Sequence, residues 1–396
     1  MGHHVGSKSS IVPLIDRLNK YPVGLPDHTK LREILALLFT EKEAYIASLF
    51  PLEEATLAEL VEATKIPAAE LLPSLEQMCD KGLVMDLPYE GEDYYLLMPG
   101  LIGFFEFTFM KSSRPDLPRE KVARLMQEYL YENPQQGMAK EFFDSKIPLT
   151  RAVPYEDHIP VSSTITSYES AREIVKNAEY GAVGICYCRH KKHHLDEECK
   201  KGAPMEDICI SLGHGARFLV RRGFAKEQTT DQLLAILEQA RDLNLTHITD
   251  NIREQPSFIC NCCSCCCELL IGVQAGYHNG IAKTPFILKI DEQLCNSCGA
   301  CIKACNVAAF KEKATGVPVV LKNDVCLGCG ACIPVCKQQA LTLVERKKHY
   351  TPPRDRREMM VRRLLERKRL SPFVVSYVKK KIRKIIRGKI QNPRIP

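Results

Sequence analysis

Two stretches of the sequence repeat the same cysteine spacing: Cys295-Asn-Ser-Cys-Gly-Ala-Cys-Ile-Lys-Ala-Cys305 and Cys326-Leu-Gly-Cys-Gly-Ala-Cys-Ile-Pro-Val-Cys336. Each reads Cys-x2-Cys-x2-Cys-x3-Cys, and Cys-Gly-Ala-Cys-Ile occurs in both, which indicates an internal duplication. Soft thiolates suit iron–sulfur clusters. Three cysteines in series, on a loop that Gly299 or Gly330 tightens, can reach three irons of one cube.

The duplicated segment, residues 286–345, resembles the bacterial ferredoxins that hold two [4Fe-4S] clusters. In those proteins the last cysteine of each motif serves the other cluster, so the resemblance implies two crossed ligand sets. One set is Cys295, Cys298, Cys301 and Cys336, and the other is Cys326, Cys329, Cys332 and Cys305. Asn306 and Lys337 stand where a proline usually follows, which removes no ligand. Zinc would instead favour two Cys-x2-Cys pairs with a longer gap.

The chain has 19 cysteines among 396 residues. Residues 1–10 lack the basic start and apolar core of a secretory signal. The longest apolar run, residues 96–110, is interrupted by Pro99, Gly100, Gly103 and Glu106 and is too short to cross a bilayer. We therefore expect a cytoplasmic protein, in which reduced thiols indicate metal or redox chemistry rather than disulfides.

A second set of cysteines precedes the duplicated motif. It consists of Cys186, Cys188, Cys199, Cys209, Cys260, Cys262, Cys263, Cys265, Cys266 and Cys267. In an extended segment Cys260 and Cys262 face one way and Cys263 and Cys265 the other. A helix that began near Cys263 would place Cys263, Cys266 and Cys267 on one face. We expect these last six cysteines to serve two different sites.

A thiolate-only ligand set predicts one or two further iron–sulfur clusters in this region, with zinc as the alternative. Three roles stay open: an electron relay beside the ferredoxin, a structural site, or a reductase site. The reductase site would have an open iron, or a low-pKa thiolate beside the basic residues Arg189, Lys191, Lys192, His193 or His194. We interpret His190, His193 and His194 as solvated residues rather than ligands, and the isolated Cys79 as a small core residue.

Residues 28–100 show the order helix, helix, helix, hairpin. Apolar spacing predicts a helix over residues 30–50, and Thr56-Leu-Ala-Glu59 has the form of a capping box that begins a second. A third helix follows Ile66-Pro67 and ends at Gly82, and two extended runs flank a turn at residues 89–93. This order resembles the winged helix-turn-helix family.

That resemblance implies DNA binding through the third helix, but the charges argue against it. The helix carries Glu70, Glu76 and Asp80 against Lys81, and residues 1–100 hold 8 Lys and Arg against 16 Asp and Glu. Phosphate neutralisation supplies most non-specific DNA affinity. We therefore expect a docking or packing module, with no DNA partner.

The remaining pattern completes an α+β multi-domain architecture. Helices are predicted at about residues 118–131, 165–178, 213–222 and 230–244, and a strand at 182–187. The alternation of helices and strands around the ten cysteines is typical of a small α/β domain. The expected parts are an N-terminal arm (1–27), a winged-helix-like domain (28–100), a helical connector (101–160), a cysteine-rich α/β domain (161–285), a dicluster ferredoxin domain (286–345) and a basic amphipathic helical tail (346–396).

The tail carries 19 Lys and Arg against 3 Asp and Glu, so the overall net charge of +7 combines a tail of +16 with a body of −9. Two helices are predicted, at about 354–370 and 372–390. Apolar residues at helical spacing line the second helix: Val374, Val378, Ile382, Ile385, Ile386 and Ile390. Such a helix suits an acidic protein, including self-association with the acidic N-terminal domain, or peripheral attachment to anionic lipid.

The order of these parts resembles a group of multi-domain iron–sulfur proteins of anaerobic bacteria and archaea, which implies electron transfer and names no substrate. We find no Rossmann or P-loop motif, so a nucleotide cofactor would belong to a partner. The sequence thus predicts a redox subunit or relay for a partner oxidoreductase. The alternatives are a reductase whose active site lies among the ten cysteines and, less favoured, a redox-sensing regulator.

Overall fold

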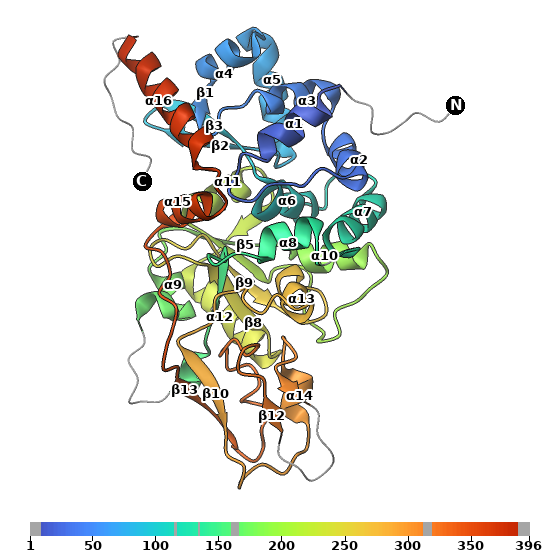
Figure 1. The fold of residues 1–396 in the computed structure, drawn as a ribbon, viewed down its shortest axis with the longest axis vertical. Coiled ribbons are helices and arrows are strands. Elements are labelled where there is room, and N and C mark those ends of the chain that lie inside the picture. The colour runs from blue at the N-terminus through green and yellow to red at the C-terminus, as the bar shows by residue number, and fades with distance from the viewer. Residues whose placement is uncertain (1–8, 115–116, 134, 160–165, 312–318, 387–396) are drawn as a thin grey trace. The chain divides into compact units, whose positions relative to one another are not determined.

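The computed structural model describes residues 9–114, 117–133, 135–159, 166–311 and 319–386 (Figure 1). The chain forms two compact units, residues 1–142 with 360–396 and residues 143–359. Both units combine helices with antiparallel sheets, in agreement with the predicted α+β class. Within the described residues, none of the helices has the length and apolar character that a membrane span requires.

The first unit begins with five helices, α1 (Ile11–Leu18), α2 (Thr29–Leu38), α3 (Glu41–Ser48), α4 (Leu57–Thr64) and α5 (Ala68–Asp80). The single helix predicted over residues 30–50 is wrong. Phe39 is extended there, and Thr40 forms a capping box with Glu43 that begins a new helix. The capping box predicted at Thr56 and Glu59 is confirmed at the start of α4.

A hairpin follows α5, as predicted. Strands β2 (Val84–Tyr89) and β3 (Glu92–Leu97) pair antiparallel, and β1 (Ala55–Thr56) joins β3 as the third strand. Glu90 and Gly91 both have positive φ, which suits the tight turn between two twisted strands. Cys79 is fully buried on α5 and is the core residue that the sequence predicted.

Short helices continue the first unit: η1 (Gly100–Phe104), α6 (Phe105–Met110), α7 (Arg119–Tyr131) and α8 (Gly137–Phe143). Helix α7 confirms the helix predicted over 118–131. Phe104 contacts Phe39 and Phe105 edge to face, with ring centroids 5.6 and 5.2 Å apart. This part of the aromatic run therefore belongs to the core of the first unit.

The basic tail forms the two predicted helices, α15 (Arg356–Glu366) and α16 (Leu370–Ile386). Arg363 is fully buried and donates to the Phe142 carbonyl (2.8 Å), and Arg367 donates to the Glu141 carbonyl (2.7 Å). Arg369 pairs with the Glu141 carboxylate at 2.5 Å. The arginines after residue 360 thus tie the tail to α8 within the first unit.

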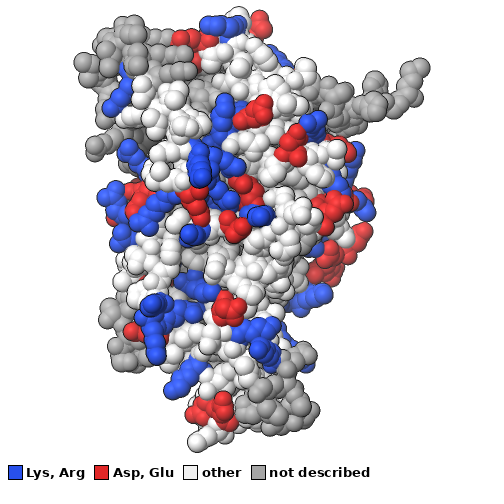
Figure 2. Space-filling view, in the orientation of Figure 1, with Lys and Arg blue, Asp and Glu red and all other residues white. Residues whose placement is uncertain are grey.

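Four apolar side chains of α16 are exposed, namely Val374, Val375, Tyr377 and Val378. Of the predicted stripe, the side chains of Ile382, Ile385 and Ile386, and all of Ile390, lie outside what the structure describes. On the face drawn in Figure 2, Lys and Arg side chains are interspersed with Asp and Glu side chains. The binding of the tail to an acidic protein or to anionic lipid remains a prediction.

The second unit is built on a six-stranded sheet with the strand order β4-β8-β9-β6-β5-β7. The strands are β4 (Thr150–Val153), β5 (Gly181–Gly184), β6 (Cys209–Leu212), β7 (Ala225–Glu227), β8 (Thr246–Asp250) and β9 (Phe258–Cys262). Every neighbouring pair is antiparallel, so the predicted α/β class is wrong for this region, which is α+β. The chain leaves β5 at Gly184 and returns beside it at Cys209, so no crossover is made.

Five helices accompany this sheet, α9 (Ala171–Lys176), α10 (Tyr187–His193), α11 (Gly213–Arg221), α12 (Thr230–Asp242) and α13 (Glu268–Gln274). Helices α11 and α12 confirm two predictions. The helix predicted over 165–178 begins at Ala171, and residue 165 lies outside the described residues. The strand predicted over 182–187 ends at Gly184, and Cys186 caps α10 instead. Helix α13 begins at Glu268 rather than near Cys263, so the condition for placing Cys263, Cys266 and Cys267 on one helix face is not met.

The duplicated cysteine segment adds two small sheets to the second unit. Strand β10 (Phe286–Ile290) pairs with β13 (Leu341–Glu345), and β11 (Phe310–Lys311) pairs with β12 (Val320–Leu321), with the one-turn helix α14 (Ala300–Ala304) in the first motif. Gly299 and Gly330 have positive φ, as their predicted role in tight loops requires. Gly328 does too, and a Cβ there would lie 2.0 Å from the Phe286 carbonyl oxygen.

Candidate metal centres

The first group of thiols in the duplicated segment crosses the two motifs. The Cys301 thiol interacts electrostatically with Cys295 of its own motif and with Cys336 of the other. Burial raises the pKa of Cys301 to about 11. Cys298 is exposed at the edge of this loop. The structure therefore brings the last cysteine of the second motif to the first.

The second group shows the reciprocal arrangement. The Cys332 thiol interacts with Cys329 and Cys326 of its own motif and with Cys305, the last cysteine of the first motif, and also with Cys301 of that motif. Burial raises the pKa of Cys329 to about 11, and Thr246 on β8 donates a hydrogen bond to its sulfur at 3.7 Å. Cys301 and Cys326 belong to the core that β10 and β13 help to form, and four further cysteines of the two motifs pack against it, namely Cys295, Cys305, Cys332 and Cys336.

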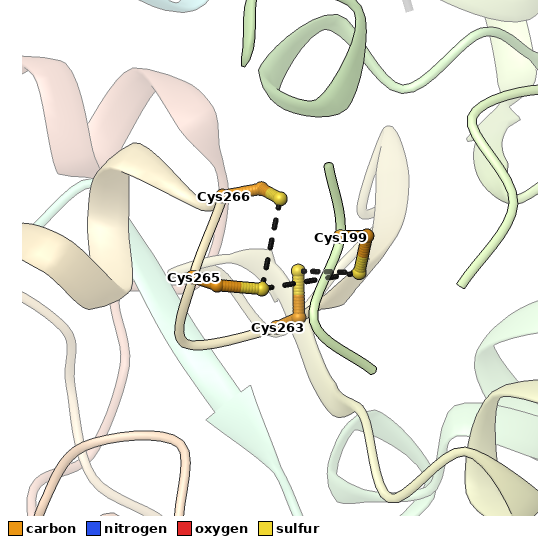
Figure 3. Close-up of side chains that lie close together, drawn as sticks. All are labelled: Cys199, Cys263, Cys265 and Cys266. Atoms are coloured by element: carbon orange, nitrogen blue, oxygen red, sulfur yellow. Dashed lines mark hydrogen bonds between the residues drawn. The ribbon is translucent and has the colours of Figure 1, made fainter. Parts of the chain in front are cut away.

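Four of the ten upstream cysteines converge on one point, which Figure 3 shows. We call Cys199, Cys263, Cys265 and Cys266 the quartet. Their four sulfurs all lie within 4.8 Å of one another. Cys199 comes from the segment after α10, and the other three from the loop that joins β9 to α13.

The spacing of the quartet fits one metal ion. The Cys199 sulfur lies 3.6 Å from that of Cys263 and 3.9 Å from that of Cys265, and the Cys265 and Cys266 sulfurs are 3.7 Å apart. Metal–sulfur bonds of about 2.3 Å in a regular tetrahedron place sulfurs about 3.8 Å apart. A cube spreads its thiolates over four irons, which requires a wider set. The quartet is thus suited to one tetrahedral zinc or iron ion.

The other six upstream cysteines lie next to one another in a closed circuit, in which each thiol interacts with two others. In order around this circuit they are Cys186, Cys188, Cys267, Cys262, Cys260 and Cys209, with Cys209 next to Cys186 again. We call these residues the ring. Cys260 and Cys262 belong to it, whereas Cys263 and Cys265 belong to the quartet, so the structure separates the two pairs as expected from an extended segment. Cys267 was expected with Cys263 and Cys266 but lies in the ring, because α13 begins only after it.

The neighbouring thiols and burial shift the pKa values of the ring. Interaction with both neighbours lowers the pKa of Cys186 and, to about 6, that of Cys260. At Cys267 burial acts to raise the pKa, and its neighbours more than offset it. Burial and the neighbouring thiols raise the pKa of Cys188, and the neighbouring thiols followed by burial raise those of Cys209 and Cys262.

Arg189 of α10 is the cation beside both sets of thiols. It is buried, and its Nη2 donates to the Asn261 carbonyl at 3.0 Å. Within the described residues, its Nε and Nη1 have no hydrogen-bond partner. Burial acts to lower the pKa of Arg189. Nearby thiols of the ring (Cys186, Cys209) and of the quartet (Cys199, Cys263) outweigh burial, so the net shift of the pKa is upward. Buried donors without an oxygen partner suit an anionic metal–sulfur centre.

The other basic residues of α10 serve different contacts. Lys191 is fully buried and forms an ion pair with Glu268, and Lys192 pairs with Glu197 at 2.8 Å. His190 is buried and lies 3.2 Å from His194, so the prediction that it is solvated is wrong. Since α10 packs its basic side into the unit rather than toward solvent, its lysines neutralise carboxylates there.

Asn306, one of the two departures from the ferredoxin pattern, connects the quartet to the duplicated segment. It is buried directly after Cys305, and its Oδ1 accepts a hydrogen bond from the backbone N–H of Ser264 at 3.2 Å, in the middle of the quartet loop. Its Nδ2 donates to the Asn244 carbonyl (2.8 Å) and to Thr246 Oγ1 (3.0 Å). A proline side chain could make none of these bonds.

Lys201 lies at the same junction. Its ammonium donates to the carbonyls of Asn244 and Ala304, both at 3.0 Å. Nearby thiols of the quartet (Cys263, Cys265) and of the second ferredoxin group (Cys305, Cys329) act on its charge. Neither Lys201 nor Thr246 carries a sequence signal of this role, but the missing proline at Asn306 could have drawn attention to the junction.

Comparison with known proteins gives one match. Residues 287–337 match the family model of a 4Fe-4S dicluster domain. This match supports the binding of [4Fe-4S] clusters by the duplicated segment. No curated protein and no solved structure matches the chain.

Proposed function

We propose that this protein transfers single electrons through two [4Fe-4S] clusters, as a relay or redox subunit for a partner oxidoreductase. The observation that carries the proposal is the duplicated motif, which matches a dicluster domain and whose thiols group across the two motifs. The proposed ligands are the two crossed sets, with Cys336 completing the first and Cys305 the second. When bound, such clusters exchange one electron each at a potential that their surroundings set.

The residues around the second set are placed to tune that potential. Backbone N–H of Ala309 donates to the Cys305 sulfur at 3.3 Å, and Thr246 donates to the Cys329 sulfur. Hydrogen bonds to ligand sulfur and nearby positive charge stabilise the more negative, reduced state. With the ammonium of Lys201 beside it, the second set should have the higher potential of the two.

The quartet extends this function toward the ten-cysteine region. We propose that it binds one zinc or iron ion, since its sulfur spacing fits a tetrahedron. Asn306, the residue after Cys305, accepts a hydrogen bond from Ser264 in the quartet loop and so joins this loop to the duplicated segment. An iron ion at this site would allow the quartet to exchange electrons with the ferredoxin clusters, whereas zinc would make it a structural site.

Anaerobic purification of the full chain, followed by iron and sulfide analysis, tests the proposal. We expect at least about eight irons per chain and, after reduction with dithionite, the EPR spectrum of two interacting [4Fe-4S] clusters. Cys329→Ser should remove about four irons, and Cys79→Ser, a buried cysteine of the first unit, should remove none. A chain that holds only zinc, or no metal, would contradict the proposed function.

A further inference from the structure

We propose that the six cysteines of the ring hold one polynuclear iron–sulfur centre, separate from the ferredoxin clusters and from the quartet. The site is built from Cys186, Cys188, Cys209, Cys260, Cys262 and Cys267. The proposal does not depend on the redox role of the duplicated segment. It assigns more than one metal ion to this site, a number that the spacing of the cysteines does not determine.

The sheet places half of the ring. Strand β6 pairs with β9 so that Ile210 lies opposite Ile259, and one further residue along this register brings Cys209 opposite Cys260. Cys262 follows two residues later on the same face of β9. Adjacent strands of one sheet thus fix three sulfurs side by side, before any metal binds.

The N-terminal ends of two helices supply the other three cysteines of the ring. Cys186 caps α10, and Cys188 lies in its first turn, while Cys267 caps α13. These three and Cys262 are each at most 8% exposed. Lys191 on α10 and Glu268 on α13 form a buried ion pair, which fixes the two helix starts relative to each other. The ring, with four buried and two partly buried cysteines, is therefore held by the fold rather than being a chance gathering of surface thiols.

A closed ring differs from the quartet in what it can bind. In the described part of the chain, the quartet is the group whose ligand atoms converge on one point. In the ring each thiol interacts with two neighbours, and these pairs follow one another around a closed circuit. One tetrahedral ion takes four thiolates and would leave two buried and unligated. A centre of several metals uses all six.

A cation suited to such a centre lies beside the ring. Arg189 is buried, and the nearby thiols of Cys186 and Cys209 act on its charge. Within the described residues, its Nε and Nη1 have no hydrogen-bond partner, whereas Lys191 is already paired with Glu268. Arg189 would therefore donate to sulfur atoms of the bound centre.

Metal and sulfide counts on matched variants of the full chain test the nuclearity. Cys262→Ser alters the ring, Cys265→Ser the quartet, and Cys79→Ser is the control in the first unit. We expect Cys262→Ser to lose at least two irons together with acid-labile sulfide. Cys265→Ser should lose one metal ion and no sulfide. Loss of one metal ion or none from Cys262→Ser, with sulfide unchanged, would overturn the proposal.

A measurement on the unaltered chain covers the case in which a ring variant does not fold. Anaerobically prepared protein labelled with 57Fe should show, by Mössbauer spectroscopy, more sulfide-bridged iron than the about eight atoms of two [4Fe-4S] clusters. Sulfide of about eight per chain, with at most one additional iron, would reject the polynuclear centre and leave the proposed function intact. Failure of the function itself would show instead as the absence of the two-cluster signal.

Discussion

Residues 286–345 and residues 186–267 are both dense in cysteine, yet they gather their thiols in different ways. In the duplicated segment three cysteines of each group lie within seven residues, and one comes from the other motif. In the upstream region the ring draws on β6, β9 and the starts of α10 and α13. The first arrangement is largely local, and the second exists only once a six-stranded sheet has formed.

The two regions also differ in the apolar cores that stabilise them. The duplicated segment has two small two-stranded sheets and a one-turn helix, and its core, which includes Cys301 and Cys326, is shared with residues of β8, β9 and α13. The upstream region has a sheet core of its own, with α9 and α12 packed against it. We therefore expect metal to be essential for the fold of the first region and less so for the second.

Metal removal is the strongest test of this comparison. Chelation after oxidation of the clusters should abolish slow hydrogen exchange in β10 and β13, because the cysteine loops between these strands would lose the metal that holds them together. Strands β8 and β9 should keep most of their protection, and the first unit serves as the internal control. Equal loss of protection in β8 and β10 would show that both regions depend on metal alike.

Acid should act on the sheet that supports the ring. Burial lowers the pKa of His247 to about 4, and its Nδ1 donates to Asn261 between Cys260 and Cys262. An unfolded histidine binds a proton near pH 6.5, so the folded state loses up to about 3 kcal/mol as the pH falls from about 6.5 to 4. Urea unfolding of His247→Gln under anaerobic conditions should depend less steeply on pH over this range.

Loss of clusters in acid is common to both proteins and cancels in that comparison. Parallel pH profiles for the wild type and His247→Gln would contradict the assignment of a neutral imidazole to His247. Above pH 7 both proteins should show little dependence on pH from this group, since His247 is then neutral in the folded and unfolded states alike.

The junction between the two regions can be broken at Asn306. Asn306→Pro restores the residue that usually follows the last ferredoxin cysteine but removes three hydrogen bonds. We expect a loss of about 2 kcal/mol and weaker metal retention by the quartet, with both [4Fe-4S] clusters still formed. Lys337→Pro, at the exposed equivalent position of the second motif, is the matched control and should leave the quartet unaffected. Equal behaviour of the two variants would mean that Asn306 does not support the quartet.

The smallest effect is expected at Lys201. Lys201→Met removes a positive charge near Cys305 and Cys329, so the second cluster should become harder to reduce, by on the order of tens of millivolts. A potentiometric titration followed by EPR measures the shift. Lys200→Met, at an exposed neighbouring position, should leave both potentials unchanged. A rise in potential in Lys201→Met would contradict the placement of its charge.

Local signals predicted local structure well. The capping box at Thr56, the hairpin after Gly82 and helix α12 follow from residues within one or two turns of each other, so neighbouring side chains are enough to specify them. The single helix expected over residues 30–50 failed because apolar periodicity continued across Thr40, where capping begins a new helix. The α/β class failed because alternation of elements does not specify the direction in which each strand returns.

The sequence by itself determined the ligand chemistry. It has eighteen candidate thiolate ligands, two copies of a ferredoxin spacing, and a run from Cys260 to Cys267 whose six cysteines are divided between two sites. Only the tertiary structure decided which distant thiols meet. Cys199 joins Cys263 across 64 positions, and Cys186 joins Cys267 through Cys188, because strand register and two helix starts bring them together. Spacing fixes sulfurs that share a loop, whereas packing of the sheet fixes those that do not.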